Sequence, residues 1–104
     1  MSRLVLNVSG TKYRVRVENG IGPAVAQNIL SQFLTGKFEV VQTLAEMKIS
    51  DVDFHAPFVI QYIAGQHRYF MSFKSRTDGD VVYYFYFTMG PEGLKVVEIG
   101  MAIA

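Results

Sequence analysis

The chain contains no cysteine and no tryptophan, and neither sign of charge is in large excess. Without cysteine it forms no disulfide and has no thiolate for catalysis or metal binding, which is typical of a reducing compartment. Ten Lys and Arg residues against nine Asp and Glu residues leave a formal net charge of +1. The total charge therefore does not direct the chain toward nucleic acid or a membrane.

Long apolar runs and recognisable functional motifs are also missing. No apolar stretch approaches the roughly 20 residues of a membrane-spanning helix, and the first residues lack the features of a signal peptide. We therefore expect a cytoplasmic protein that does not bind a membrane. Because no catalytic, metal or nucleotide-binding motif of useful specificity is present, we predict no cofactor and no metal. Enzymatic activity stays open, with a non-enzymatic role favoured.

Hydrophobic residues make up 50% of the 104 residues and charged residues 18%, which predicts one folded domain over residues 1–104. The most strongly patterned segment is 80–89, where Val, Tyr, Phe and Thr are typical of a β-strand. Glycine-containing turns before and after it predict hairpins. The result is an antiparallel meander of four strands, at residues 58–64, 67–76, 80–90 and 94–103.

The turns also predict the register of the meander. A loop at 77–79 places Phe73 opposite Tyr83, whereas a two-residue turn would carry Lys74 toward the core. After the central strand, a loop of Pro91, Glu92 and Gly93 would place Gly90 opposite Leu94. In this register one face is apolar throughout, and the predicted core consists of Phe58, Ile60, Tyr62, Tyr69, Met71, Phe73, Tyr83, Phe85, Phe87, Val97, Ile99, Met101 and Ile103.

One helix is predicted, at residues 22–35, because Pro23 suits its first turn and apolar residues recur at helical spacing. Its other face carries only uncharged polar residues. A short strand at 37–42 and one helical turn at 43–48 follow. The predicted fold class is α+β, with a four-stranded antiparallel meander curled around one helix and an N-terminal β-hairpin, which is cystatin-like by analogy only.

The N-terminal hairpin turns at Ser9 and Gly10 and places Arg3 directly opposite Arg16. Like charges that face each other across a ladder are mildly destabilising. Either solvent and Glu18 screen them, or an anionic partner binds the basic residues of this hairpin, Arg3, Lys12, Arg14 and Arg16. The run from residue 4 to residue 17 resembles the first strands of the potassium-channel tetramerisation domain, but no later segment continues the pattern and no family is assigned.

Asp51, Asp53 and His55 alternate in the loop that precedes Pro57. Two carboxylates and an imidazole could bind a metal or perform acid–base chemistry. A single histidine without an identifiable partner is weak support, so a polar loop that leads into a proline is the favoured interpretation.

The outward side of the meander has fewer charges than a solvated sheet face. One interpretation is that the N-terminal hairpin or residues 43–57 fold over it. A second is that it binds a protein or another copy of the chain. A third is stacking of single-stranded nucleic acid, which Glu98 and the low net charge disfavour. The candidate partner-binding residues are Tyr84, Tyr86, Phe70, Arg68, Lys74, Val82 and Val96.

These observations predict a non-enzymatic interaction protein that self-associates, as a homodimer for example, or binds another protein through this outward aromatic face. The first alternative is a small-ligand binder or enzyme with an apolar pocket between helix and sheet, where Tyr62, Tyr69 and Tyr83 would supply hydroxyl groups. The second alternative is a single-stranded nucleic-acid binder.

Overall fold

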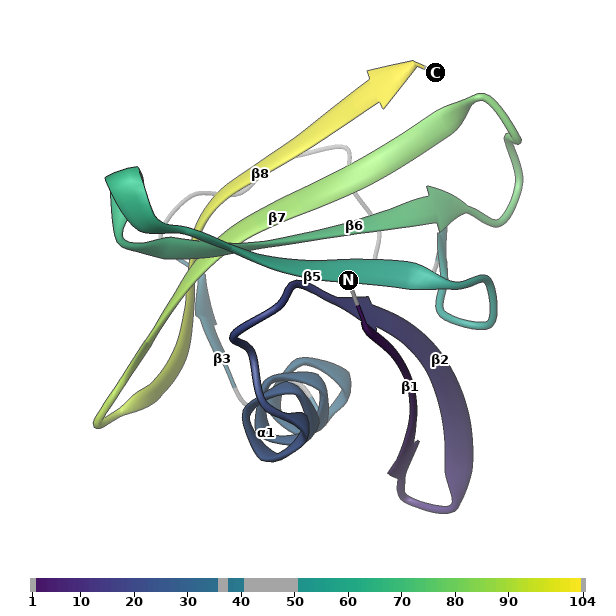
Figure 1. The fold of residues 1–104 in the computed structure, drawn as a ribbon. Coiled ribbons are helices and arrows are strands. Elements are labelled where there is room, and N and C mark those ends of the chain that lie inside the picture. Colours follow the sequence, from purple (N-terminus) through teal and green to yellow (C-terminus); the bar gives the residue numbers. More distant parts are fainter. Residues whose placement is uncertain (1, 36–37, 41–50, 104) are drawn as a thin grey trace.

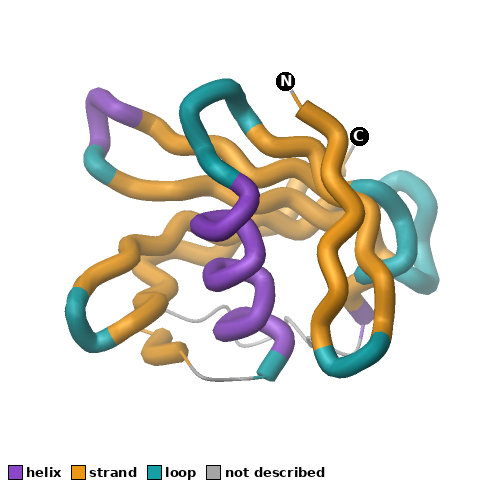
Figure 2. The backbone as a smooth tube through the Cα atoms, turned by 60° about the horizontal axis from the view of Figure 1, so that its bottom comes forward, coloured by secondary structure: helices purple, strands orange, loops and turns teal. Residues whose placement is uncertain are grey.

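The computed structural model describes residues 2–35, 38–40 and 51–103, which form a small, compact α+β domain (Figures 1 and 2). One α-helix, α1 (Pro23–Leu34), and a short 3-10 helix, η2 (Ala64–Gln66), occur in these residues. The strands are β1 (Ser2–Val8), β2 (Thr11–Val17), β3 (Phe38–Val40), β4 (Val52–Asp53), β5 (Phe58–Ile63), β6 (Arg68–Ser75), β7 (Val81–Gly90) and β8 (Gly93–Ile103).

All of these strands belong to one mostly antiparallel sheet in the order β1-β2-β5-β6-β7-β8-β3, and β4 pairs with β6. The predicted fold class is correct as far as α+β and a mostly antiparallel sheet. The prediction of a four-stranded sheet was wrong, because β2 joins β5 and β3 joins β8 through parallel pairs. No hairpin turn marks such a pair in the sequence.

The antiparallel registers follow the predicted pairs over most of their length. Phe73 lies opposite Tyr83, and Tyr62 opposite Tyr69. In the N-terminal hairpin Arg3 lies opposite Arg16, as predicted, and Ser9 and Gly10 turn with positive φ. Local turn chemistry therefore determines these pairings.

The tip of the β7–β8 hairpin departs from the predicted register. Gly90 pairs with Gly93 rather than with Leu94. A β-bulge or irregularity between Tyr86 and Phe87 shifts the register by one residue, so the pairs farther from the turn, from Tyr86 onward, are the predicted ones. As a result Val96 lies opposite Phe87 and is fully buried. Val96 was predicted to lie on the outward face, and the bulge is the reason that it lies in the core instead.

Helix α1 packs on the concave side of the curved sheet (Figure 1). Its buried residues are Ala26, Ile29, Leu30 and Phe33, four members of the predicted apolar stripe. The ring of Phe33 lies 5.6 Å from that of Phe73 and 4.9 Å from that of Phe85. The core is therefore an aromatic and aliphatic layer between α1 and the middle strands.

The polar side of α1 binds both flanks of the sheet. Gln27 Nε2 donates to the carbonyl of Asn7 on β1 at 2.7 Å. Gln32 Oε1 accepts the N–H of Leu94 on β8, also at 2.7 Å. A side-chain amide has both an N–H group that donates to a backbone carbonyl and an oxygen that accepts from a backbone N–H. These contacts therefore explain why this side of the helix is polar without being charged.

Several predicted core residues are not buried. Tyr62 is 39% exposed, Met101 53% and Ile103 80%. The reason for the last two is that the C-terminal end of β8 runs away from α1 (Figure 1), so apolar alternation continues beyond the packed layer. The predicted helical turn at 43–48 lies outside the described residues.

Candidate binding surface

The outer face of the sheet, the side turned away from α1, carries three aromatic rings that pack together. Phe70 on β6 lies opposite Tyr86 on β7, and their ring centroids are 5.1 Å apart. Tyr84 lies 6.3 Å from Phe70 and 5.8 Å from Tyr86. We call Phe70, Tyr84 and Tyr86 the aromatic cluster. All three side chains are only half-buried.

Tyr84 lies flat against the neighbouring strand. Its register partner on β8 is Gly100, and a Cβ atom added there would overlap the tyrosine ring. The ring therefore covers the glycine backbone, which is buried. The Tyr84 ring is therefore in close contact with the backbone of β8 and is only half-buried.

Arg68 connects the aromatic cluster to an ion pair with Glu98. Its guanidinium carbon lies 4.0 Å from the ring centroid of Tyr86, a cation–π distance. One guanidinium nitrogen lies 3.6 Å from a carboxylate oxygen of Glu98. Arg68 is thus held in place from two sides.

The N-terminal hairpin does not cover this face, as one interpretation of the sequence proposed. It extends the sheet instead, since β2 pairs with β5. Along one row of the register Arg16 adjoins Val59, Val59 adjoins Ser72, and Ser72 adjoins Tyr84. Three strand spacings separate Arg16 from Tyr84, about 14 Å. The basic hairpin and the aromatic cluster therefore belong to one surface.

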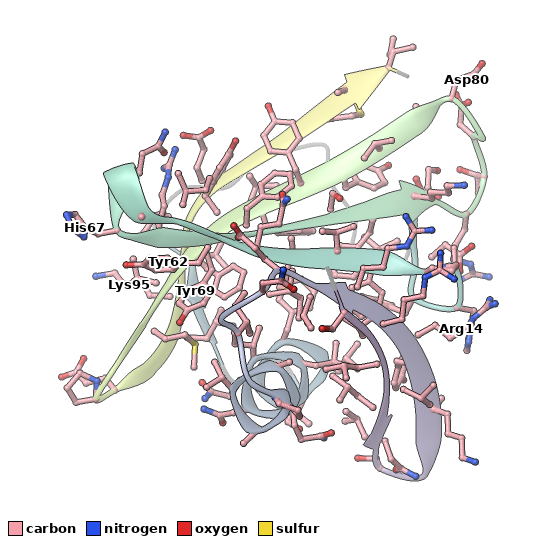
Figure 3. All side chains as sticks on the ribbon, viewed as in Figure 1. Arg14, Tyr62, His67, Tyr69, Asp80 and Lys95 are labelled. Atoms are coloured by element: carbon pink, nitrogen blue, oxygen red, sulfur yellow. The ribbon has the colours of Figure 1, made fainter. Side chains whose placement is uncertain are left out.

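Charge is unevenly distributed over this surface, although the whole chain is nearly neutral. The register places three acidic residues on it: Glu98 pairs with Arg68, Asp53 Oδ1 accepts the N–H groups of His55 and Ala56, and Glu39 is the register partner of Lys95. Basic residues are more numerous and lie on both flanks, as the labelled Arg14 and Lys95 show (Figure 3). The basic side chains of the outer face are Arg3, Lys12, Arg14, Arg16, Arg68, Lys74 and Lys95.

A pocket of about 250 Å³ opens on the outer side of the β1–β2 hairpin. Arg3, Arg14 and Arg16 surround it, and Val5 and Pro57 contribute apolar surface. We call it the arginine pocket. Sequence reasoning identified its three arginines but not Pro57, because the approach of Pro57 depends on the unpredicted pairing of β2 with β5.

A polar cluster joins the loop before β4 to the β6–β7 connection. The Asp51 carboxylate accepts hydrogen bonds from the hydroxyls of Tyr83, Thr77 and Ser75, the last two at 2.7 and 2.8 Å. These donors lower the pKa of Asp51 from 3.8 to about 2, with the Tyr83 hydroxyl the largest cause. The same bond raises the pKa of Tyr83, which is buried.

Asp51, Asp53 and His55 do not converge on one point. Asp51 belongs to the polar cluster and Asp53 caps its own turn, whereas the His55 ring stacks on Tyr13 at 6.4 Å. Arg14 donates to the carbonyl of His55 at 3.0 Å. In the described part of the chain, no three side chains of His, Cys, Asp or Glu are grouped as metal ligands. These contacts attach residues 51–57 to the sheet.

The pocket proposed between helix and sheet has a counterpart at the N-terminal end of α1. It measures about 390 Å³, and Tyr62 and Tyr69 line it together with Glu18, Ile21 and Val25. Figure 3 shows both labelled tyrosines on the side of the sheet that faces α1. Tyr83, the third predicted hydroxyl donor, does not line this pocket and binds Asp51 instead.

Comparison with known proteins gives no assignment, because no family model, curated protein or solved structure matches the chain. Among the described residues no helix has the length and apolar character needed to span a membrane. Functional inference therefore rests on the surface itself.

Proposed function

We propose that this protein is a non-enzymatic interaction protein whose outer sheet face binds another protein. The observation that carries the proposal is the aromatic cluster, three half-buried rings at the centre of a sheet face that no described element covers. Tyrosine and arginine are enriched where interfaces derive most of their binding energy. The cystatin-like arrangement remains an analogy of shape and contributes nothing to the functional argument.

The charge distribution favours a different protein over a second copy of this chain. In a two-fold symmetric dimer the same patch lies on both subunits, so the basic flanks of one outer face would meet those of the other. Like charges across an interface oppose association. A partner with acidic residues around an apolar centre would instead be complementary.

A protein partner also fits the rings better than single-stranded nucleic acid does. Stacking platforms need free ring faces. Arg68 lies over the ring of Tyr86, and Tyr84 covers Gly100 with one face. The rings meet at interplanar angles of 51° and 76° around Tyr86, so they form a compact knob rather than a row of parallel platforms.

Affinity capture from the native host, followed by binding measurements on the purified partner, tests the proposal. Tyr86→Ala is expected to weaken binding by about 10- to 100-fold, the effect of losing a central anchor. Tyr62→Ala is the matched control, because Tyr62 is partly exposed on the opposite side of the sheet.

Equal loss in both variants, or no loss in either, would contradict binding through the outer face. Sedimentation equilibrium of the parent protein provides a second test. If the parent protein is a dimer and Tyr86→Ala is a monomer, the outer face binds a second copy of the chain and not a different protein.

A further inference from the structure

The arginine pocket contains two facing like charges, Arg3 and Arg16, that make no hydrogen bond or ion pair with a described residue. We propose that it is a carboxylate-binding subsite that receives an acidic side chain of the protein partner. This inference rests on the proposed function, and it names the chemistry that the partner must present on one side of the aromatic cluster.

The guanidinium groups of Arg3 and Arg16 carry like charges that no described residue neutralises. Arg3 and Arg16 are directly opposite each other on β1 and β2, where Cβ atoms lie about 5 Å apart. The ion pair of Arg68 with Glu98 involves neither of them. No described residue accepts a hydrogen bond from either Arg3 or Arg16. An incoming anion would relieve this repulsion.

Arg14 is held in position at the pocket before any ligand binds. The guanidinium of Arg14 donates one N–H to the carbonyl of His55, which holds the side chain at the pocket and leaves its other N–H groups available. His55 is itself stacked on Tyr13. Arginine forks match the geometry of a carboxylate and bind it through two parallel hydrogen bonds.

The pocket also has an apolar surface. Val5 is 65% exposed and sits between Arg3 and Asn7 on β1, and Pro57 lines the same pocket from the segment before β5. A volume of about 250 Å³ accommodates a carboxylate with its methylene groups. Glutamate and aspartate side chains supply both parts, whereas an inorganic anion would leave the apolar wall without a contact.

The position of the pocket fits a partner that also contacts the aromatic cluster. Arg16 and Tyr84 are separated by about 14 Å across the sheet. A standard protein interface buries about 800 Å² on each side, so it covers both features. One partner can therefore place an apolar residue against the aromatic cluster and an acidic residue in the pocket.

Titration of the full chain with an N-acetylated hexaglutamate peptide at 0.15 M salt tests this inference, with hexaglutamine as the uncharged control. In NMR spectra of the protein, we expect the backbone amide signals of Arg3, Arg14 and Arg16 to shift with hexaglutamate and not with hexaglutamine. Arg3→Gln and Arg16→Gln should each weaken hexaglutamate binding at least about fivefold. Lys95→Gln removes the same charge on the opposite flank, beyond the Debye length of about 8 Å, and should change affinity less than about twofold.

Equal binding of hexaglutamine, or equal loss in Lys95→Gln and Arg16→Gln, would overturn a carboxylate subsite and indicate a diffuse positive field. Tighter binding of an oligothymidylate at the same amides would overturn the protein partner in favour of nucleic acid. The two proposals fail separately. If capture of the partner depends on Tyr86 but hexaglutamate does not bind, the proposed interface is supported and the proposed carboxylate subsite is wrong.

Discussion

The ring of Tyr84 lies over the backbone of Gly100, its register partner on the next strand. Gly100→Ala is therefore expected to destabilise the protein by about 1–3 kcal/mol, since the added methyl group forces the ring outward. Urea denaturation measures the change. Tyr84→Ala combined with Gly100→Ala should lose less stability than the sum of the single variants. Gly79→Ala, where an added Cβ meets nothing within 4 Å, should stay within about 0.5 kcal/mol of the parent.

Tyr86 and Phe85 are neighbours in sequence that face opposite sides of the sheet. Phe85 is buried in the core, so Phe85→Ala should reduce the free energy of unfolding by about 3–5 kcal/mol. Tyr86→Ala loses the contacts of its ring with Phe70, Tyr84 and Arg68 on a half-exposed face and should reduce the free energy of unfolding by about 1 kcal/mol. Chemical denaturation compares the two. A loss of 3 kcal/mol or more for Tyr86→Ala would mean that the outer face is covered.

The polar cluster predicts a defined response to acid. Hydroxyl donors lower the pKa of Asp51 to about 2 in the folded protein, against 3.8 for the unfolded chain. Because the folded value is the lower one, the contribution of Asp51 is present above pH 4 and disappears as pH falls toward 2. The stability difference between the parent and Asp51→Asn should shrink across this window. In Tyr83→Phe the pKa of Asp51, followed by NMR, should rise because its main donor is lost.

The contact between Gln32 and the β8 backbone predicts a specific effect at the helix. Gln32→Ala removes the acceptor of the Leu94 N–H and should reduce the free energy of unfolding by about 1 kcal/mol. Gln32→Glu retains an oxygen at the same position and should preserve most of the stability that this hydrogen bond contributes. Amide exchange at Leu94 gives a local measurement, and equal protection in both variants would show that the bond does not contribute.

The sequence predicts those parts of the fold that local turns determine. The Ser9–Gly10 turn and the connections around β6 and β7 set pairs such as Phe73 with Tyr83 and Phe70 with Tyr86, because a shift of one residue would expose the apolar face. The aromatic cluster and Arg68 could be located in this way. Val96 could not, because two adjacent valines at 96 and 97 give the same alternation with or without a bulge.

The uneven distribution of charge over the outer face could not be predicted from the sequence, for a different reason. The parallel pair that aligns Arg16 with Val59 joins segments without any connecting turn, so nothing local marks it. Without that pair, nothing in the sequence connects the basic hairpin to the aromatic cluster. The uneven charge is thus a property of the topology rather than of the composition.

The parallel pairing of β2 with β5 also sets an order of events during synthesis. The β1–β2 hairpin closes through a two-residue turn, whereas joining Val17 to the segment that begins at Phe58 closes a loop of about 40 residues. Chains emerge with the N-terminus first, so the three arginines are available before the segment that supplies Pro57 exists. On a nascent chain that has released only its first hairpin, the arginine pocket is therefore incomplete, because the side formed by Pro57 is missing.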